Sequence, residues 1–590
     1  MLMSLPRIFH TVLPFTMKAE DASEEERPAE STRETIDQLL YSFVLLILAR
    51  AFLIEPFVIP TGSMAPTLYG RHKECVCDAC GFDYQIGASA EVRKGTAVML
   101  PGSRITLSPC PNCRFPNDVK DAMAFNGDYI VVNKWAFDLG EPERFDVFVF
   151  KWPTGPQENY IKRLVGMPGE TTRVRGGDLY RVVDGREEIL RMDNPRKRRA
   201  ASILVHDNDF PVPTLREAGF PERWVGDGWE EAGTARTLPE PPAETAWLTY
   251  THLVPSADDW RAVADGRRPT PRPRLIADYC PYNSYTGTEY GDLSRRPGGP
   301  VPEEVDEGVL WVPDIAAEFD LDLAEVGDGA EVVLELTEGV YRYRCRIDPG
   351  AGVARLVTVN VQMDPDEERP LAEAAVPVRG GGLYALRFAN FDDELALWVD
   401  GVPVDFGGAA RYTRTRLDNT LPTRGDLSPI RIGLRGASGT ASRLRVFRDL
   451  CYRVGRPGGG PDVNFERMLS RTLTDPAEYA AAYATAGERN LVQDIVTGPE
   501  EYLAMGDNSP QSSDSRMWSR GRQVVPESHL VGKAFFTYWP HGVPFLNNGR
   551  GFAVRPHYEP APGGGLQKVE DYPQYVVPFY PNYQRMTRIR

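Results

Sequence analysis

Histidine is scarce in this sequence, with only seven copies among 590 residues. None of them stands next to a serine in a motif typical of a Ser-His-Asp site, although distant residues can also assemble such a site in space. The scarcity therefore points away from histidine as the base that activates a nucleophile. A different base has to be sought if the chain is a hydrolase.

An excess of positive charge is also missing, because the net charge is −16. Nucleic acid is a polyanion, so this balance argues against a nucleic-acid partner as the main function. It equally argues against simple electrostatic adhesion to anionic lipid. We expect no nucleic acid among the partners.

Long apolar runs are missing except near the N-terminus, where QLLYSFVLLILARAFLI spans 17 residues from Gln38 to Ile54. As a helix this run would extend about 26 Å, slightly less than the ~30 Å hydrocarbon core of a bilayer. We expect a single retained membrane span over residues 36–55. A cleaved signal sequence and a buried core helix are the alternatives. The flanking charges do not fix the orientation of the span.

Two short runs supply a nucleophile and a base. Ser63 lies in the Gly- and Pro-constrained run 59–68, and Lys162 lies in the apolar run 159–170. A serine hydroxyl needs a base, and lysine serves only when neutral, although its reference pKa is about 10.4. Burial among apolar neighbours lowers that pKa because desolvation penalises the ammonium. The two runs together predict a Ser/Lys nucleophile pair, whereas Lys162 alone would be typical of an ordinary strand.

These runs, taken in order behind an apolar segment, resemble the bacterial type I signal peptidases, which are membrane-bound Ser/Lys proteases. The resemblance extends to two strand-like runs between them and to a Gly-Asp-Asn-containing run near the C-terminus. The segments that carry it are residues 34–68, 126–132, 144–150, 160–170 and 505–516. It covers under a third of the chain.

The resemblance implies roles for six residues. Ser63 would be the acylated nucleophile and Lys162 its general base. Thr61, with the backbone N–H of Ser63, would form the oxyanion hole. Ser512 would orient the lysine, and Asp514 and Arg516 would form a supporting pair.

The resemblance also implies partners and a location. The substrates would be exported preproteins with small residues at positions −1 and −3 of the signal peptide. The enzyme would be a single-pass protein of the plasma (inner) membrane, in contact with lipid, with its catalytic domain outside the cytoplasm. Catalysis would need no cofactor.

Eight cysteines include a C-x2-C…C-x2-C pattern formed by Cys77, Cys80, Cys110 and Cys113. Two such knuckles are typical of a tetrahedral zinc ribbon, so we expect a possible structural Zn here. Cys75 could substitute for Cys77. Disulfides are the alternative, because an oxidising exterior would favour them.

The expected fold is mainly β: a signal-peptidase-like β catalytic core behind one N-terminal transmembrane helix, with an inserted β-sandwich. Strand-like runs at 331–336, 341–347, 384–390 and 394–401 predict the sandwich. It resembles laminin-G or concanavalin-like jelly rolls. The expected parts are a cytoplasmic segment 1–35, the anchor 36–55, core residues 56–180 with a ribbon insert 72–118, a Pro/Arg-rich insert and linker 181–304, the sandwich 305–455, further core 456–545 and a C-terminal tail 546–590 that is extended or poorly ordered.

Two other functions compete with a signal peptidase. A self-cleaving repressor-type protease shares the Ser/Lys logic, but it would need a DNA-binding module and no membrane anchor. A surface binding protein would carry its function on the β-sandwich and keep a degenerate protease core. The presence of Ser63, Lys162, Ser512 and Asp514 counts against that second alternative.

Overall fold

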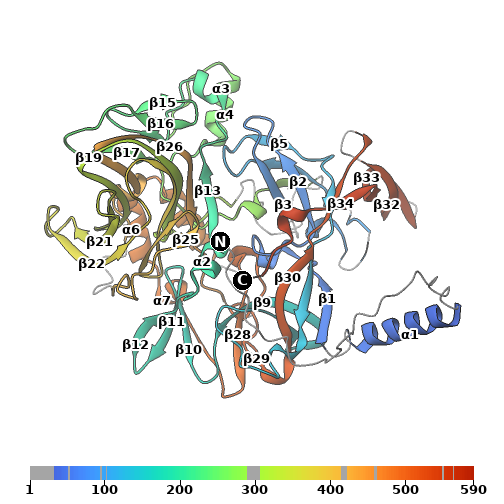
Figure 1. The fold of residues 1–590 in the computed structure, drawn as a ribbon. Helices are drawn as coiled ribbons and strands as arrows, with labels where there is room; N and C mark the ends of the chain where they lie inside the picture. Colours follow the sequence, from blue (N-terminus) through green and yellow to red (C-terminus); the bar gives the residue numbers. More distant parts are fainter. Residues whose placement is uncertain are drawn as a thin grey trace, which may run out of the picture. The chain divides into compact units, whose positions relative to one another are not determined.

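The computed structural model describes residues 32–48, 50, 53–93, 96, 98–100, 103–288, 306–413, 421–456, 462–547, 551–561 and 564–589. The chain divides into two units, Met1–Leu53 and Ile54–Arg590. Strands dominate the second unit (Figure 1), so the expectation of a mainly β fold is confirmed.

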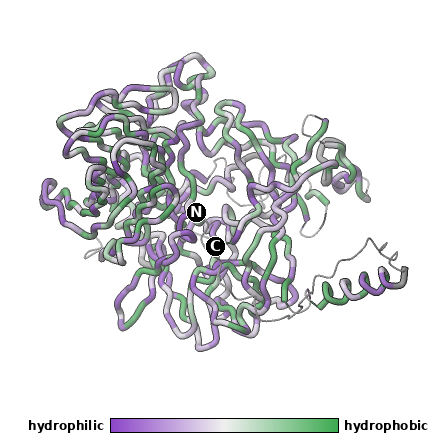
Figure 2. The backbone as a smooth tube through the Cα atoms, viewed as in Figure 1, coloured by the Kyte–Doolittle hydropathy of each residue, from purple (hydrophilic) through white to green (hydrophobic). Residues whose placement is uncertain are grey.

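Helix α1 (Thr32–Leu48) belongs to the first unit, and its second half is apolar (Figure 2). The sequence predicts a membrane span over residues 36–55, but the end of that run is different: Ile54 begins strand β1. No helix in the described ranges has both the length and the apolar character that a membrane crossing requires. The predicted span is therefore not confirmed. Residues 49, 51 and 52 of the run lie outside the described residues.

A seven-stranded antiparallel sheet joins distant parts of the second unit. Leu503 pairs with Gly166, and Lys533 pairs with both Asn133 and Phe148. The first half of β9 is exposed and its last six residues are buried, which places Lys162 in the buried part. The strands, in spatial order, are β1 (Ile54–Val58), β7 (Tyr129–Asn133), β30 (Leu530–Trp539), β8 (Val147–Trp152), β9 (Gly155–Gly166), β28 (Glu501–Met505) and β29 (Val525–Pro526).

Three small sheets flank this one along the chain. One continues from β9 and contains β12 (Arg186–Ile189), β11 (Asp178–Val183), β10 (Thr171–Arg175) and β27 (Val492–Val496). Two carry the cysteine pattern: β3 (Asp83–Gly87), β2 (His72–Val76) and β6 (Ala124–Phe125) form one, and β18 (Thr286–Thr288), β4 (Ile105–Pro109) and β5 (Pro116–Asp118) form the other.

A thirteen-stranded sheet fills the long insertion. Its longest strand, β19 (Ile315–Glu338), pairs with β23 through its first half and with β20 through its second half, and bulges separate the halves. The inner face buries large apolar side chains such as Phe319, Leu334, Phe388 and Ile432. This arrangement is compatible with the expected sandwich.

The other strands of that sheet are β13 (Ile203–Asp207), β14 (Trp224–Val225), β15 (Glu230–Ala232), β16 (Ala235–Leu238), β17 (Ala246–Tyr250), β20 (Tyr341–Asp348), β21 (Val353–Asn360), β22 (Glu368–Ala375), β23 (Gly382–Phe391), β24 (Glu394–Val399), β25 (Val402–Pro403) and β26 (Ile430–Arg448). The predicted hairpin at 331–347 is present as β19 and β20, and the predicted pair at 384–401 is present as β23 and β24.

Two segments differ from the expectation. Strands β13 to β17 lie in the stretch 181–304 that was expected to be a linker, and three of them pair directly with β26. The tail after residue 545, expected to be extended, forms the hairpin β32 (Phe552–Pro560) and β33 (Leu566–Val577). Strand β34 (Phe579–Pro581) pairs with β31 (Gly542–Pro544). Long-range pairing with β26 overrides the Pro-rich composition in the first segment, and a local hairpin forms in the second.

The helices of the second unit are short. They are α2 (Pro195–Ala201), α3 (Pro213–Glu217), α4 (Ala257–Ala264), α5 (Val463–Thr472), α6 (Pro476–Ala484) and α7 (Glu488–Leu491). A helix is predicted from Pro476 onward, and α6 confirms it, with the Asp475 side chain accepting from the backbone N–H groups of the first turn.

Candidate active site

Ser63 lies in a short 3₁₀ turn, η2 (Gly62–Met64), directly after β1. The turn packs so closely that a side chain at position 62 would collide with the Tyr282 ring, because an added Cβ would lie 2.0 Å from Cε1. The Ser63 side chain is buried, and its residue is 9 % exposed. The glycine before Ser63 is therefore required by packing, which holds the hydroxyl in place.

Lys162 lies opposite Phe148 of β8 and points its amine at Ser63. Its Nζ donates to Ser63 Oγ at 2.5 Å and to the Ile161 carbonyl at 3.0 Å. Burial lowers the pKa of Lys162 to about 8, against partial compensation by Asp514 and Asp507. The neutral amine needed by a general base is thus accessible near neutral pH.

Asp514 and Arg516 form a buried, two-pronged pair. Arg516 Nε donates to Asp514 Oδ1 at 2.9 Å and Nη2 donates to Oδ2 at 2.6 Å. The Gly506 backbone N–H also donates to Asp514 at 3.0 Å. Burial alone would raise the pKa of Asp514, but the Arg516 charge and these hydrogen bonds hold it below its usual range. A permanent negative charge therefore sits near Lys162.

Ser512 is buried beside the nucleophile turn. A Cβ added to Gly506 would lie 2.3 Å from Ser512 Oγ and 2.4 Å from the Ser63 carbonyl oxygen, so all three meet there. Ser512 helps to lower the pKa of Asp514, but its Oγ makes no well-formed hydrogen bond within the described part of the chain. Thr61, in contrast, is exposed in extended backbone just before η2.

The structure thus brings Ser63 and Lys162 into contact and gathers Ser512, Asp514 and Arg516 around them. It places Thr61 two residues from Ser63, with no side-chain bond capping the turn. These positions do not test the catalytic roles, which stay predictions.

A second buried ion pair lies beside the site, and no sequence pattern predicted it. Arg163 Nε and Nη2 donate to the two Asp507 oxygens at 2.8 and 2.5 Å, and both side chains are fully buried. Thr67 Oγ1 donates to the same carboxylate at 2.5 Å, which joins this pair to the segment after Ser63. Strand alternation could have indicated this pair: successive side chains of a strand point to opposite faces, so Arg163 lies on the face opposite to Lys162.

Asn508 was not predicted either, because a Gly-Asp-Asn run is typical of an ordinary turn. Its Nδ2 donates to the Gly62 carbonyl at 2.9 Å, and its backbone N–H donates to the Ser63 carbonyl at 3.1 Å. Asn283, from the insertion, exchanges amide hydrogen bonds with it at 2.8 and 2.9 Å. The nucleophile turn is thus fixed from both the C-terminal region and the insertion.

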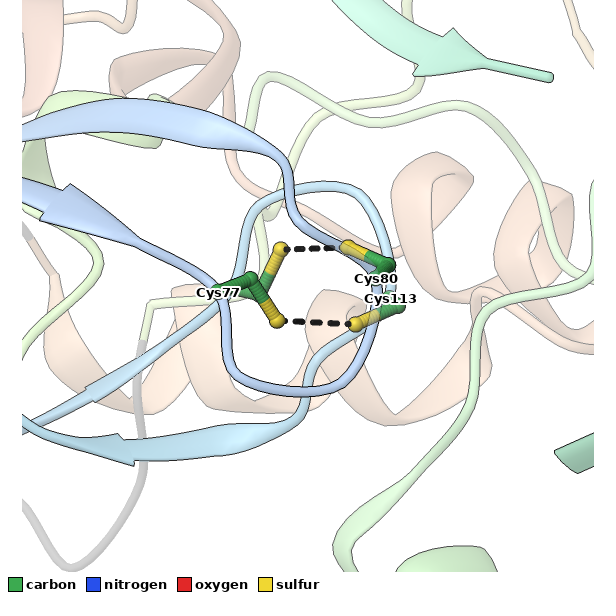
Figure 3. A group of neighbouring side chains, drawn as sticks. Cys77, Cys80 and Cys113 are labelled. Atoms are coloured by element: carbon green, nitrogen blue, oxygen red, sulfur yellow. Dashed lines mark hydrogen bonds between the residues drawn. The ribbon is translucent and has the colours of Figure 1, made fainter. Parts of the chain in front are cut away.

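The four predicted cysteines lie together at the tips of two hairpins (Figure 3). The Sγ atoms of Cys77 and Cys113 are 3.5 Å apart, and those of Cys80 and Cys110 are 3.7 Å apart. The four Sγ atoms all lie within 4.8 Å of one another. None of these cysteines is in a disulfide in the described structure, where Cys75 is also free.

This donor set fits a zinc ion. Four sulfur ligands in a closed cluster are typical of structural sites, in which no position remains for a substrate. Hydrogen bonds among the thiols lower the pKa of Cys77 and Cys80, whereas the same neighbours and burial raise the pKa of Cys110 and Cys113, so a metal ion would have to displace the remaining thiol protons. Zinc would supply cross-linking of the two hairpins.

Residues 111–217 and 463–539 match the model of the family "Signal peptidase, peptidase S26". These two segments of the chain are thus similar to the type I signal peptidases. The matched residues include Lys162, Ser512, Asp514 and Arg516, while Ser63 lies before them. The resemblance seen in the sequence is confirmed for this family. Its zinc-ribbon and laminin-G-like parts stay predictions.

Curated relatives agree with the family match. Signal peptidase I of Pseudomonas fluorescens is 33 % identical over 132 residues, which are 22 % of this chain and 30 % of the relative. Signal peptidase I of Aquifex aeolicus is 47 % identical over 64 residues, 11 % of this chain and 23 % of the relative. The chain therefore spans less than a third of the length of these relatives.

The comparison with solved structures gives only weak likenesses. Galectin LEC-6 of Caenorhabditis elegans is 10 % identical, and the match covers 22 % of this chain and 83 % of the galectin with a TM-score of 0.17. A likeness of that size carries no argument about ligands.

Proposed function

We propose that this protein is a serine endopeptidase that removes signal peptides from exported preproteins. The observation that carries the proposal is the 2.5 Å contact between Lys162 Nζ and Ser63 Oγ in a buried site. Its support is the family match, which includes the lysine. A buried lysine with a pKa of about 8 can act as a general base, and the serine that it contacts can then act as a nucleophile.

The proposed reaction is acyl transfer in two steps. Neutral Lys162 takes the proton of Ser63 Oγ while that oxygen forms a bond with the scissile carbonyl carbon. The C–N bond then breaks, and the Lys162 ammonium returns the proton to the leaving amine. Water repeats the sequence on the acyl-enzyme: Lys162 accepts its proton, the ester bond breaks and Ser63 regains its hydrogen.

The surrounding residues prepare this base and nucleophile. Two hydrogen bonds join Asp514 to Arg516, and the two charges act on the pKa of Lys162 in opposite directions, Asp514 raising it and Arg516 lowering it. We assign Ser512 to orienting the amine and Thr61, with the Ser63 N–H, to stabilising the oxyanion. One oxyanion donor typically contributes ~10²–10³ in rate. The exposed position of Thr61 leaves its hydroxyl open to a substrate.

The proposed setting is the plasma (inner) membrane, with the catalytic unit on the outer side and lipid as a neighbour. An apolar segment from Gln38 to Ile54 precedes Ser63 by about ten residues, which suits a substrate presented at the lipid surface. Preproteins with small residues at −1 and −3 are the proposed substrates. The cysteine cluster and the β-sandwich are assigned structural or docking roles.

The proposal is tested by cleavage of a preprotein with a small-x-small site by detergent-solubilised wild type, Ser63→Ala and Lys162→Met. We expect only the wild type to cut, at that site. Thr214→Ala, in the short helix α3 far along the chain, is the matched control and should cut like the wild type. Equal inactivity of all proteins on several preproteins would favour a binding protein with a degenerate core.

A further inference from the structure

Three side chains outside the proposed active site form a second cluster of metal-ligand type. His72 and Glu74 lie two residues apart on β2, so they share one face of the strand. His541 lies between β30 and β31. One ligand atom from each lies within 4.8 Å of the others, and Glu74 Oε1 is 2.8 Å from His541 Nε2.

The hydrogen bonding of His72 leaves one nitrogen ready for a ligand. Its Nδ1 is 2.7 Å from the Gly70 carbonyl oxygen, which can only accept, so Nδ1 carries the proton. Nε2 is then a bare lone pair. It is fully buried and has no hydrogen-bond partner within the described ranges. A ligating histidine typically has this arrangement, with the second nitrogen donating to a backbone carbonyl.

His541 is bonded differently, because its Nε2, which faces Glu74, is the nitrogen that would bind an ion. Its Nε2 contacts Glu74 and, at 3.2 Å, the Asn582 amide, while its Nδ1 is buried without a partner in the part of the chain that the structure describes. The residue is 3 % exposed, so bulk water does not compensate. The buried Nε2 of His72 is therefore a nitrogen whose lone pair is free to bind an ion, and its burial without a partner is unfavourable.

We propose that His72, Glu74 and His541 bind a divalent transition-metal ion, zinc in the first place. Two imidazoles and one carboxylate form a donor set that zinc accepts, with a fourth position left for water. The 2.8 Å separation of Glu74 and His541 is near the roughly 3.3 Å ligand-to-ligand edge of a tetrahedron with bonds of ~2.0–2.1 Å. Arg585, a cation that acts on both His72 and Glu74, is paired with Asp128 at 3.1 Å.

The site joins segments that are far apart in sequence. Strand β2 leads into the first cysteine knuckle, while His541 follows β30 of the seven-stranded sheet. His72 also holds the Gly70 carbonyl, and Gly70 packs on Thr61, since an added Cβ would lie 2.2 Å from the Thr61 carbonyl carbon. A bound ion would therefore fix the cysteine hairpins to the sheet and stiffen the segment beside Ser63. This inference does not depend on the proposed protease activity.

Cobalt(II) tests the site because its spectrum separates the two donor sets. Metal-free full-length protein is titrated with Co(II), and the thiolate charge-transfer band reports the cysteine cluster while weaker visible d–d bands report nitrogen and oxygen ligands. We expect the wild type to bind one equivalent more than His541→Gln or Glu74→Gln. The thiolate band should be unchanged in both variants, which also shows that they fold.

Glu74→Gln is the more conservative variant, because its amide oxygen can still accept from His541. We expect its affinity for the second equivalent to fall at least roughly tenfold, so that this equivalent is absent at Co(II) concentrations that just saturate the wild type. His252→Gln is the matched control: His252 is a buried histidine bonded to Tyr250 in the large sheet, and its loss should leave both equivalents in place. Equal Co(II) stoichiometry and affinity in the wild type, His541→Gln and Glu74→Gln would overturn the proposal.

Discussion

The two ion pairs beside Ser63 and the ion pairs across the outer strands β20 to β22 of the thirteen-stranded sheet differ in their exposure to solvent. Around Ser63, both partners of Arg163–Asp507 are 0 % exposed, and those of Arg516–Asp514 are 2 % and 0 % exposed. In the large sheet, Arg346 and Glu368 pair at 2.6 Å with side chains that are each 27 % exposed. The two ion pairs beside Ser63 are thus fully buried, whereas the pair between β20 and β22 lies at the solvent boundary, although other charges of the large sheet, such as Glu335 and Arg387, are buried.

This difference indicates that the buried ion pairs fix the geometry of the site and add little to the stability of the fold. A buried ion pair loses so much hydration that apolar residues of similar volume are often equally stable. Its persistence around Ser63 is best explained by the geometry that it fixes, because both pairs anchor segments next to the nucleophile turn. The large sheet needs no such precision and relies on its apolar core.

The largest expected effect is loss of cleavage in Lys162→Met. Removing the base should lower kcat/KM by at least roughly 10⁴-fold, since the partners of such a site act as a unit. The fold should persist or gain, because below pH 8 burial of the charged amine costs about 3 kcal/mol, from the shift of pKa to about 8. Single-turnover cleavage and urea unfolding at pH 7 measure the two quantities.

Full activity in Lys162→Met would contradict the proposed dyad. Ser63→Ala is the companion variant. It should be equally inactive, and its free energy of unfolding in urea should stay within about 1 kcal/mol of the wild-type value. A large loss of stability in Ser63→Ala would mean that the hydroxyl has a mainly structural role.

The next effect concerns the buried pair itself. Asp514→Ala leaves Arg516 buried without its carboxylate, which should lower the free energy of unfolding by about 3–5 kcal/mol. The replacement of both, Asp514→Ala with Arg516→Met, should recover part of that loss. Chemical denaturation of the single and double variants checks this double-mutant cycle, and additive losses would show that the two side chains are not coupled.

The cysteine cluster should give a smaller, metal-dependent effect. Cys80→Ser removes one sulfur ligand from the four and should reduce zinc retention and lower the melting temperature. Cys345→Ser, a buried cysteine of the large sheet outside any cluster, is the control. Zinc content by mass spectrometry under native conditions separates the two, and a wild type without zinc but with disulfides would contradict the metal assignment.

The pH dependence of cleavage should follow the lysine. Because burial lowers the pKa of Lys162 to about 8, the neutral base becomes more abundant as pH rises toward that value. The rate kcat/KM should therefore rise about tenfold per unit below pH 8 and level off above it. A profile that is flat between pH 6 and 9 would show that Lys162 does not titrate in the rate-limiting step.

The sequence singled out Ser63 and Lys162, which the structure brings into contact, but not the groups that hold them; the catalytic roles stay predictions. Ser63 and Lys162 were found because their chemistry requires a constrained turn and an apolar strand, and both are local patterns. Arg163, Asp507 and Asn508 were missed because their roles come from partners hundreds of positions away, which no local pattern shows. The strands in the segment expected to be a linker were missed likewise, since their pairing with β26 is entirely long-range.

The smallest expected effect tests the other side of the comparison. Arg355 and Glu373 pair at 2.7 Å across β21 and β22, with side chains 49 % and 57 % exposed. Such a pair contributes about 0–1 kcal/mol, so Glu373→Ala should change stability within that range and leave cleavage unaltered. A loss comparable to that of Asp514→Ala would break the distinction between the two sheets, because surface charge would then stabilise the insertion as strongly as buried charge stabilises the region around Ser63.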